Sequence, residues 1–477
     1  MGGDVPIPEL RRALHRVADE IADYLDSVGE RRVLPLVEPG DVAAQLPPSP
    51  PRTGESLEQI LDDYKQLIEP NVTHWNHPGF LAYFSITGSG PGIIGEALAS
   101  ALNVNAMLWR TSPAATELEV VTCDWLRQML GLDEGFSGHI NDTASISTLL
   151  ALAAARHRLD PTIRERGLAG RSEVSGLTVY ASDQAHSSVD KAVMALGIGH
   201  GNLRRIACDE QFRLAPEELA AAIEADRQTG LQPMAVVATA GTTSTTSVDP
   251  LTAIADLCQR QGLWLHVDGA YAGSAAVCEE YRRHFAGWER ADSIVVNPHK
   301  WLFTPVDCSV LFVREEDLLR ETFSLVPEYL RSQEGEKNLM DLGVQLGRRF
   351  RALKLWMVIR AFGVDGLQER IRYHCALAEE LARRIDGDRD FEVVAPVPFS
   401  TVCFRWLEGA DDDERDAKNE ALLARINAEG PVFLSHTRLR GRYVLRAAIG
   451  NLRTTKEHVD AAWRTVRRCA RRLDAAG

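Results

Sequence analysis

Two short apolar stretches in this sequence are each followed at once by a side chain that could do chemistry. Leu263–Val267 and Ser293–Val296 are typical of buried strands, with Asp268 just past the first and Lys300 just past the second. The carboxyl ends of parallel strands open onto a shared crevice, where ligands bind. A lysine amine condenses with an aldehyde, and a carboxylate holds a pyridine nitrogen protonated. The pair therefore predicts a site for pyridoxal phosphate.

An isolated aspartate and lysine at this spacing are more often a structural ion pair at a sheet edge. The residues around them reverse that preference; they are His266, Ala270, Asn297 and His299. Two further side chains, His186 and Thr243, also come just after predicted strands. A lone histidine is more often structural, but this shared position is what the crevice rule predicts.

The elements that must position these side chains alternate between strand and helix. The predicted strands are Leu177–Ala181, Met234–Thr239, Leu263–Val267, Ser293–Val296 and Ser309–Val313. The predicted helices between them include Ser187–Leu196, Pro216–Asp226 and Pro250–Gln261. Such a series predicts an α/β fold with a mostly parallel sheet and helical crossovers.

A possible phosphate site precedes this series. Residues 141–145, with the sequence NDTAS, open a strongly helical run from Ile146 to Arg158. Backbone N–H groups at a helix N-terminus, together with small hydroxyls, bind phosphate. On these residues alone, an ordinary Asp or Thr N-cap is at least as probable an interpretation.

Longer motifs extend the pattern. HVDGAYAG at 266–273 and NPHKW at 297–301 resemble the cofactor core of the group II pyridoxal-phosphate decarboxylases, particularly the aromatic-L-amino-acid decarboxylases. SPAATELE, SDQAHSSVDKA, ATAGTT and LGRRFRALKLW continue the likeness in the same order. The resemblance runs from about the first predicted helix to the C-terminus.

The resemblance implies a fold type I pyridoxal-phosphate enzyme, with helices on both faces of the central sheet and a small C-terminal α+β domain. The implied domains are an N-terminal helical segment (1–88), a large cofactor-binding domain (89–357) and a small domain (358–477). Residues 8–27 and 56–68 repeat apolar groups helically on either side of a proline-rich stretch, 33–52. Such faces need a partner. In the resembled family this segment clasps the second subunit of a homodimer.

The resemblance also assigns roles to individual residues. Lys300, Asp268, His186 and Tyr329 would be catalytic; Lys300 would hold pyridoxal phosphate covalently and Tyr329, in the polar connection 323–345, would protonate the substrate carbon. The implied cofactor-binding residues are Thr143, Ala144, Ser145, His186, Thr243, Asp268, Ala270, Asn297, His299 and Lys300. The implied substrate pocket comprises Trp75, Tyr83, Phe84, Ile86, Asn105, Met107 and Gly347.

Several residues depart from the family pattern. Asp142 stands where a glycine is usual, and its carboxylate would repel a phosphate, so we expect it to point away or to cap the backbone. Ser85 and Ile86 replace a Pro-Thr pair of animal members. Asn105 and Met107 stand where apolar or aromatic groups often reach the neighbouring subunit's pocket.

The implied reaction is decarboxylation of an aromatic L-amino acid to its amine. An aldehyde synthase uses the same scaffold, but typically has phenylalanine for the loop tyrosine in plants, or a changed stacking histidine in insects; Tyr329 and His186 favour simple decarboxylation. A glutamate-type enzyme would need cations for the side-chain carboxylate, for which Arg110 is a candidate. A catalytically silent dimer is the third alternative. Gly347 matches members that accept an indole, whereas plant tyrosine-type members carry serine.

Bulk composition excludes other classes. The 477 residues carry a net charge of -14, which argues against a nucleic-acid or anionic-membrane surface. No apolar run approaches membrane-spanning length, and the N-terminus lacks the apolar core of a signal peptide. The eight cysteines show no zinc-like spacing, so we expect no metal and a reducing, cytoplasmic location.

Overall fold

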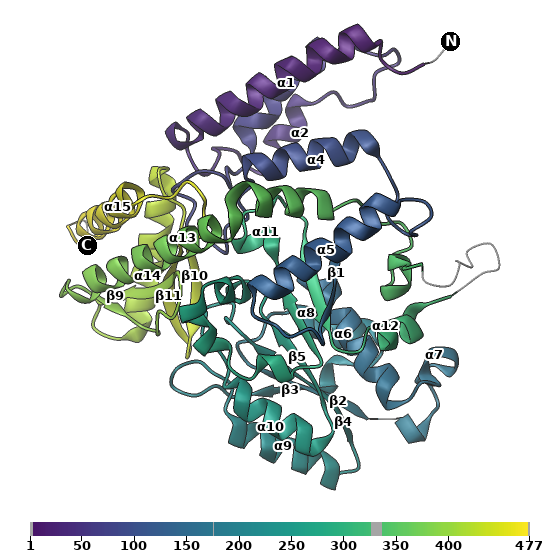
Figure 1. Ribbon diagram of the computed structural model, residues 1–477. Coiled ribbons are helices and arrows are strands. Elements are labelled where there is room, and N and C mark those ends of the chain that lie inside the picture. The colour runs from purple at the N-terminus through teal and green to yellow at the C-terminus, as the bar shows by residue number, and fades with distance from the viewer. Residues whose placement is uncertain (1–2, 175, 326–335, 476–477) are drawn as a thin grey trace. The chain divides into compact units, whose positions relative to one another are not determined.

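The computed structural model describes residues 3–174, 176–325 and 336–475 (Figure 1). The described residues form two compact units. The first unit comprises residues 3–85, 406–447 and 451–475, and the second comprises residues 86–405 and 448–450, apart from the gaps given above. The division into three domains at residues 88 and 357 stays a prediction.

The second unit is built on a mixed sheet. Its described residues form seven strands in the order β1-β7-β6-β5-β4-β2-β3. Strands β3, β2, β4, β5 and β6 run parallel, whereas β7 is antiparallel to both β6 and β1. The bounds are β1 Ser137–Asn141, β2 Leu177–Ser182, β3 Leu203–Ile206, β4 Gln232–Thr239, β5 Trp264–Asp268, β6 Ser293–Val296 and β7 Ser309–Val313. The mostly parallel sheet predicted from the sequence is confirmed.

Two strands of this sheet were not predicted. β1 has the sequence SGHIN, with little apolar character, and β3 has LRRI, with two arginines among four residues. β3 lies at the sheet edge. Both strands lack a local apolar pattern, and they form because they pair with strands that are separated from them in the sequence.

Helices cover both faces of the sheet. On one face, Ala235 and Val237 of β4 pack in a core with Leu150 and Val189 from helices α6 and α8. Alternate residues of a strand point to opposite faces, and α9 and α10 also contact β4. The helices of this unit have the bounds α4 Gly90–Leu102, α5 Pro113–Met129, α6 Ala144–Leu159, α7 Ile163–Arg166, α8 Ser188–Ala195, α9 Pro216–Gln228, α10 Leu251–Gln261, α11 Pro298–Trp301, α12 Glu316–Phe323 and α13 Ala352–Asp386.

The first unit contains the N-terminal helices. α1 (Ile7–Ser27) and α3 (Leu57–Asp63), which continues as a π-helix through Tyr64–Ile68, confirm the two predicted amphipathic helices. The prolines of the stretch 33–52 predict that it is not a regular helix; the structure has only one short helix there, α2, at Asp41–Gln45. The prolines lie outside that short helix, so none removes one of its hydrogen bonds.

The C-terminal part contributes to both units. α14 (Asp412–Glu429), β10 (Ser435–Leu439), β11 (Arg442–Ala448) and α15 (Lys456–Asp474) follow β8 (Phe391–Val393) and β9 (Thr401–Trp406). The polar composition of residues 408–418 predicts a surface loop, but this prediction is wrong from Asp412 onward, where α14 begins. Asp411 accepts the Glu414 N–H at 2.9 Å and so caps a helix whose acidic first turn favours its dipole.

Across the described residues 3–174, 176–325 and 336–475, no helix has the length and apolarity needed to cross a membrane.

Candidate active site

Asp268 and Lys300 follow neighbouring strands. Asp268 ends β5 and pairs in register with Val295 of β6, and Lys300 lies in α11, directly after β6. The two turns are tied together, because Asn297 N–H donates to the Ala270 carbonyl at 3.1 Å and Lys300 N–H donates to the Asn297 carbonyl at 2.9 Å. The carboxyl ends of β5 and β6 therefore hold the predicted aspartate and lysine at one edge of the sheet.

The Asp268 carboxylate is buried. Its Oδ1 accepts the Ala270 N–H at 3.0 Å, and within the described part of the chain no other hydrogen bond to this carboxylate is present. His266, two residues earlier on the same strand, bonds Ser293 Oγ through Nδ1 at 2.9 Å. Burial lowers the pKa of His266 to about 4, so it is neutral beside Asp268. Asp268 is thus free to bind a cationic ring nitrogen.

His186 lies in the turn between β2 and α8. Its Nδ1 accepts the Ser188 N–H at 3.1 Å, which fixes the ring. Although part of the side chain is exposed, desolvation lowers the pKa of His186; Asp268 raises that pKa and Lys300 lowers it. The three predicted catalytic residues therefore share one electrostatic environment, as the crevice rule requires.

Thr243 is exposed and lies in a loop that is closed by Asp249. Sequence reasoning missed this aspartate. Asp249 is buried; its Oδ2 accepts the Thr239 N–H and its Oδ1 the Leu214 N–H, each at 2.7 Å. Burial raises the pKa of Asp249 to about 7, although the two N–H groups oppose the rise. Since Thr239 pairs with Asp268 in register, this carboxylate joins the Thr243 loop to the strand end beside Asp268.

The predicted phosphate site begins α6. Ala144 and Ser145 are its first residues and are partly buried, while Thr143 is the N-cap and is exposed. Of the two alternatives expected for Asp142, the structure shows the contact with the backbone: its Oδ1 accepts the Thr143 N–H at 2.5 Å, and its Oδ2 accepts a hydrogen bond from Gln345 Nε2 at 3.1 Å. The Thr143 N–H is therefore already used, which leaves Ala144 and Ser145 as the stronger phosphate candidates.

Asn297 and His299 supply further polar groups. Within the described residues, the buried Oδ1 of Asn297 has no hydrogen-bond partner. His299 Nδ1 accepts the Cys308 N–H at 2.9 Å, and burial lowers the pKa of His299 to about 3. A neutral His299 thus carries its proton on Nε2 as a donor. An amine, a buried carboxylate, the Nε2–H of His299 and a helix N-terminus fit pyridoxal phosphate.

The predicted substrate residues lie in both units. In the first, Trp75 and Tyr83 stack with ring centroids 6.1 Å apart, and Arg446 lies 4.5 Å from the Phe84 centroid. In the second, Ile86 is partly buried, and Asn105, Met107 and Gly347 come together. Asn105 Nδ2 donates to Met107 Sδ at 3.3 Å, and a Cβ built on Gly347 would lie 4.0 Å from the same nitrogen.

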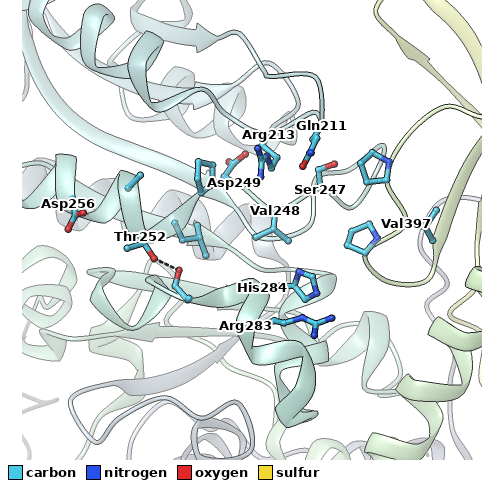
Figure 2. Close-up of a pocket in the computed structure, with 16 residues that line it drawn as sticks. Gln211, Arg213, Ser247, Val248, Asp249, Thr252, Asp256, Arg283, His284 and Val397 are labelled. Carbon is cyan, nitrogen blue, oxygen red and sulfur yellow. Dashed lines mark hydrogen bonds between the residues drawn. The ribbon is translucent and has the colours of Figure 1, made fainter.

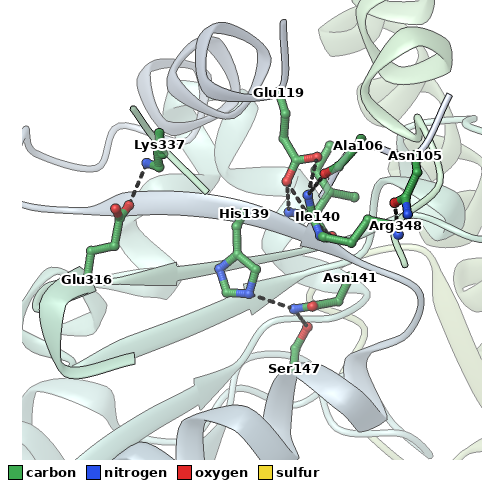
Figure 3. Close-up of polar contacts among 10 residues, drawn as sticks. All are labelled: Asn105, Ala106, Glu119, His139, Ile140, Asn141, Ser147, Glu316, Lys337 and Arg348. Carbon is green, nitrogen blue, oxygen red and sulfur yellow. Dashed lines mark hydrogen bonds and ion pairs between the residues drawn. The ribbon is translucent and has the colours of Figure 1, made fainter. Parts of the chain in front are cut away.

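A buried ion pair holds this second group (Figure 3). Arg348 binds both oxygens of Glu119, at 2.7 and 3.2 Å, and donates to the Ile140 carbonyl at 2.7 Å. Ile140 N–H in turn donates to Glu119 Oε1 at 2.9 Å. Sequence reasoning missed this pair; the only signal was the presence of both residues in family-like motifs.

Two other features complete the description. Tyr329 lies outside the described residues. A hollow of about 720 Å³ opens beside Asp249, and its lining residues include Arg213, Ser247, Arg283 and His284 (Figure 2). None of the predicted cofactor residues is among the described residues that line this hollow. The described residues also contain no cluster of His, Cys, Asp or Glu arranged to hold a metal ion.

Comparison with known proteins gives consistent matches over the full length. The pyridoxal-dependent decarboxylase conserved domain matches residues 39–407. Tryptophan decarboxylase 2 of Oryza sativa subsp. japonica is 43% identical, covering 96% of this chain and 94% of its own. Phenylacetaldehyde synthase of Arabidopsis thaliana is 41% identical, covering 96% and 95%. The crystal structure of Oryza sativa TDC with PLP and tryptamine superposes with a TM-score of 0.95 at 39% identity, covering 99% and 100%.

Proposed function

This chain belongs to the family of pyridoxal-dependent decarboxylases, and on that premise we propose that it converts aromatic L-amino acids to the corresponding amines and CO₂. It is an amino-acid decarboxylase that uses pyridoxal phosphate. The observation that carries the proposal is the meeting of Asp268, Lys300 and His186 at the carboxyl ends of β5, β6 and β2. The names of the similar proteins support an aromatic substrate.

The roles of the chain's residues follow from their chemistry. Lys300 would bind the cofactor covalently through Nζ, and Asp268 would hold a proton at the pyridine nitrogen. Bound pyridoxal phosphate supplies an electron sink for the electron pair released with CO₂. His186, fixed through Nδ1, would stack on the ring with its proton on Nε2, while the small side chain of Ala270 leaves room on the other face. Ala144, Ser145, Asn297 and His299, and less directly Thr143, would bind the phosphate or line its site.

The fate of the substrate carbon separates this function from that of an aldehyde synthase. Similarity does not decide, because the decarboxylase and the aldehyde synthase named above are 43% and 41% identical to this chain. We propose that Tyr329 donates a proton to the substrate carbon, which yields amine. The presence of Tyr329 and His186 in the sequence supports this assignment.

We also propose a homodimer. Helix α1 buries none of its residues in the described structure, and its Ile7, Leu14 and Ile21 are exposed. In the second unit, Ile94, Leu98 and Leu102 form an exposed apolar stripe on α4 at helical spacing. Apolar stripes of this kind mark protein contacts. A second copy of the chain would cover them, in line with the family resemblance.

The function is tested by incubating the purified protein and pyridoxal phosphate with tryptophan, 5-hydroxytryptophan, phenylalanine, tyrosine and DOPA. We expect amine and CO₂ in equal amounts from at least one of them. Lys300→Ala is the control; it should lose both turnover and the visible absorbance of the bound cofactor, because its amine is replaced by a methyl group. Release of CO₂ from glutamate alone, or aldehyde as the main product, would contradict the proposal.

A further inference from the structure

The side-chain amide of Asn105 is exposed but held in one orientation. Its Oδ1 accepts the backbone N–H of Arg348 at 2.9 Å, and its Nδ2 donates to Met107 Sδ at 3.3 Å. A thioether sulfur is a weak acceptor, and an amide nitrogen carries two hydrogens. The acceptor side of Asn105 is therefore used within the protein, whereas its donor side keeps the capacity to bind a ligand.

Rigid contacts surround this amide. Ala106 N–H donates to the Arg348 carbonyl at 2.9 Å, and the Arg348 guanidinium is buried against Glu119. Arg348 Nη1 also donates to the Ala106 carbonyl at 3.3 Å. Because these bonds fix the backbone on both sides, Asn105 presents its donor with little loss of side-chain freedom on binding.

The amide lies beside the predicted phosphate site. Arg348 Nη2 binds the Ile140 carbonyl and Gln345 Nε2 binds Asp142, so the segment 345–348 is attached to the residues directly before α6 (Figure 3 shows the Arg348 contacts). Among the described residues, a Cβ on Gly347 would have only Asn105 Nδ2 within 4 Å. As far as the described residues show, the donor therefore borders open space at Gly347, in a segment attached to residues that would hold the cofactor.

We propose that Asn105 Nδ2 donates a hydrogen bond to the hydroxyl oxygen of a ring-hydroxylated substrate. The inference rests on the proposed function and narrows it: aromatic amino acids with a ring hydroxyl are preferred to their unsubstituted counterparts. A site that offers a donor loses that bond when the hydroxyl is absent. The same amide acts whether the pocket belongs to its own subunit or to a second copy, since each copy carries Asn105.

Asn105→Leu tests the inference, because leucine matches asparagine in size and removes the donor. For the wild type and the variant, kcat/KM is measured with tyrosine and phenylalanine, and with 5-hydroxytryptophan and tryptophan. We expect each hydroxylated-to-unsubstituted ratio to fall about tenfold in the variant, which corresponds to about 1.4 kcal/mol. The circular dichroism spectrum and Tm of the variant, compared with those of the wild type, report whether it is folded, since leucine also removes the Oδ1 that accepts the Arg348 N–H.

Asn202→Leu serves as a matched control, since its amide bonds the Ile198 carbonyl outside the predicted site; its ratios should equal those of the wild type. Unchanged or increased ratios in Asn105→Leu would overturn the inference, as would an equal loss with all four substrates. If the wild type releases CO₂ from none of these amino acids, it is the proposed function that fails. The two failures are therefore distinguishable.

Discussion

At the scale of single residues, backbone contacts determine which ring nitrogen of His186 and of His299 carries the proton. His186 accepts an N–H through Nδ1, and its lowered pKa keeps the ring neutral at pH 7, so its proton is on Nε2. His299 has the same arrangement, with Nδ1 bonded to Cys308 N–H. Both imidazoles are therefore oriented donors before any ligand binds, and neither adds a positive charge that would compete with Lys300.

The first prediction concerns Tyr329. Tyr329→Phe should lose most amine formation and divert substrate to aldehyde with oxygen consumption, because a general acid of this kind contributes roughly 10²–10⁴-fold. Substrate affinity should persist, since the phenol acts after CO₂ has left. The measurement is amine, aldehyde and peroxide per CO₂, with and without air. Amine at the parental rate would make His186 the first alternative donor.

The second prediction concerns Gly347. A serine fits among the described residues, because a Cβ there meets no described atom nearer than Asn105 Nδ2 at 4.0 Å. Gly347→Ser should lower kcat/KM for tryptophan about tenfold more than for tyrosine, since the larger ring needs the open space. Equal losses for the two substrates, measured side by side, would place Gly347 outside the pocket.

At the scale of elements, one buried ion pair joins three segments. Glu119 on α5 and Arg348 before α13 both bond to Ile140 of β1. Neither charge is exposed to water, so each depends on the other for solvation. This pair fixes the positions of Asn105 and Gly347 relative to the N-terminus of α6, and so couples the predicted substrate residues to the predicted phosphate residues.

The third prediction follows from that pair. Arg348→Met should lower the free energy of unfolding by about 3–5 kcal/mol, because it leaves the Glu119 carboxylate buried without its partner. Its neighbour provides the control: Arg349 is exposed and pairs with Glu96 at the surface. Arg349→Met should cost at most about 1 kcal/mol in the same urea titration. Similar costs for the two variants would show that the Glu119–Arg348 pair contributes little.

At the scale of the whole molecule, the exposed apolar stripes on α1 and α4 support the proposed homodimer. The fourth prediction is that deletion of residues 1–50, which removes α1 and α2, yields monomers or aggregates without activity. Light scattering gives the mass, and amine release gives the activity. A truncated protein that is monodisperse, monomeric and active would contradict the dimer.

The fifth prediction concerns pH. Burial lowers the pKa of His139 and His299 to about 3, and of His77 and His266 to about 4. In the unfolded chain the pKa of a histidine is near 6.5, so below that pH the unfolded chain binds a proton at each of these positions and the folded chain does not. Each histidine therefore lowers the free energy of unfolding by up to ~1.4 kcal/mol for every pH unit below 6.5. Asp249, whose pKa is raised to about 7, opposes them with one proton.

Four histidines lower the stability of the folded state on acidification, whereas Asp249 alone raises it, so the free energy of unfolding decreases overall. With saturating pyridoxal phosphate, Tm should therefore fall as the pH is lowered from 6.5 toward 4.5, before the paired carboxylates titrate. Differential scanning calorimetry at half-unit intervals checks this expectation. A Tm that is constant or rises across that window would show that Asp249 and the remaining groups outweigh the buried histidines.

The strand ends and the cofactor class could be predicted from the sequence, and the contact of Asp142 with the backbone was one of two alternatives. Apolar runs that stop at Asp268 and Lys300 identify strand ends locally, and a carboxylate next to a phosphate site has few favourable partners besides backbone N–H groups. For the same reason, the predicted boundaries of these strands lie close to the observed ones. Where the local pattern was weak, as in β1, β3 and the start of α14, prediction failed.

Only the tertiary structure revealed the contacts between distant residues. Glu119 and Arg348 are 229 positions apart, and Asp249 and Leu214 are 35 apart. Nothing local selects such partners, because any buried carboxylate needs some donor and the fold decides which one arrives. The same holds for Asn105 beside Gly347. Sequence determines which groups can do the chemistry, whereas burial and long-range hydrogen bonds decide which of them are oriented and which remain available to a ligand.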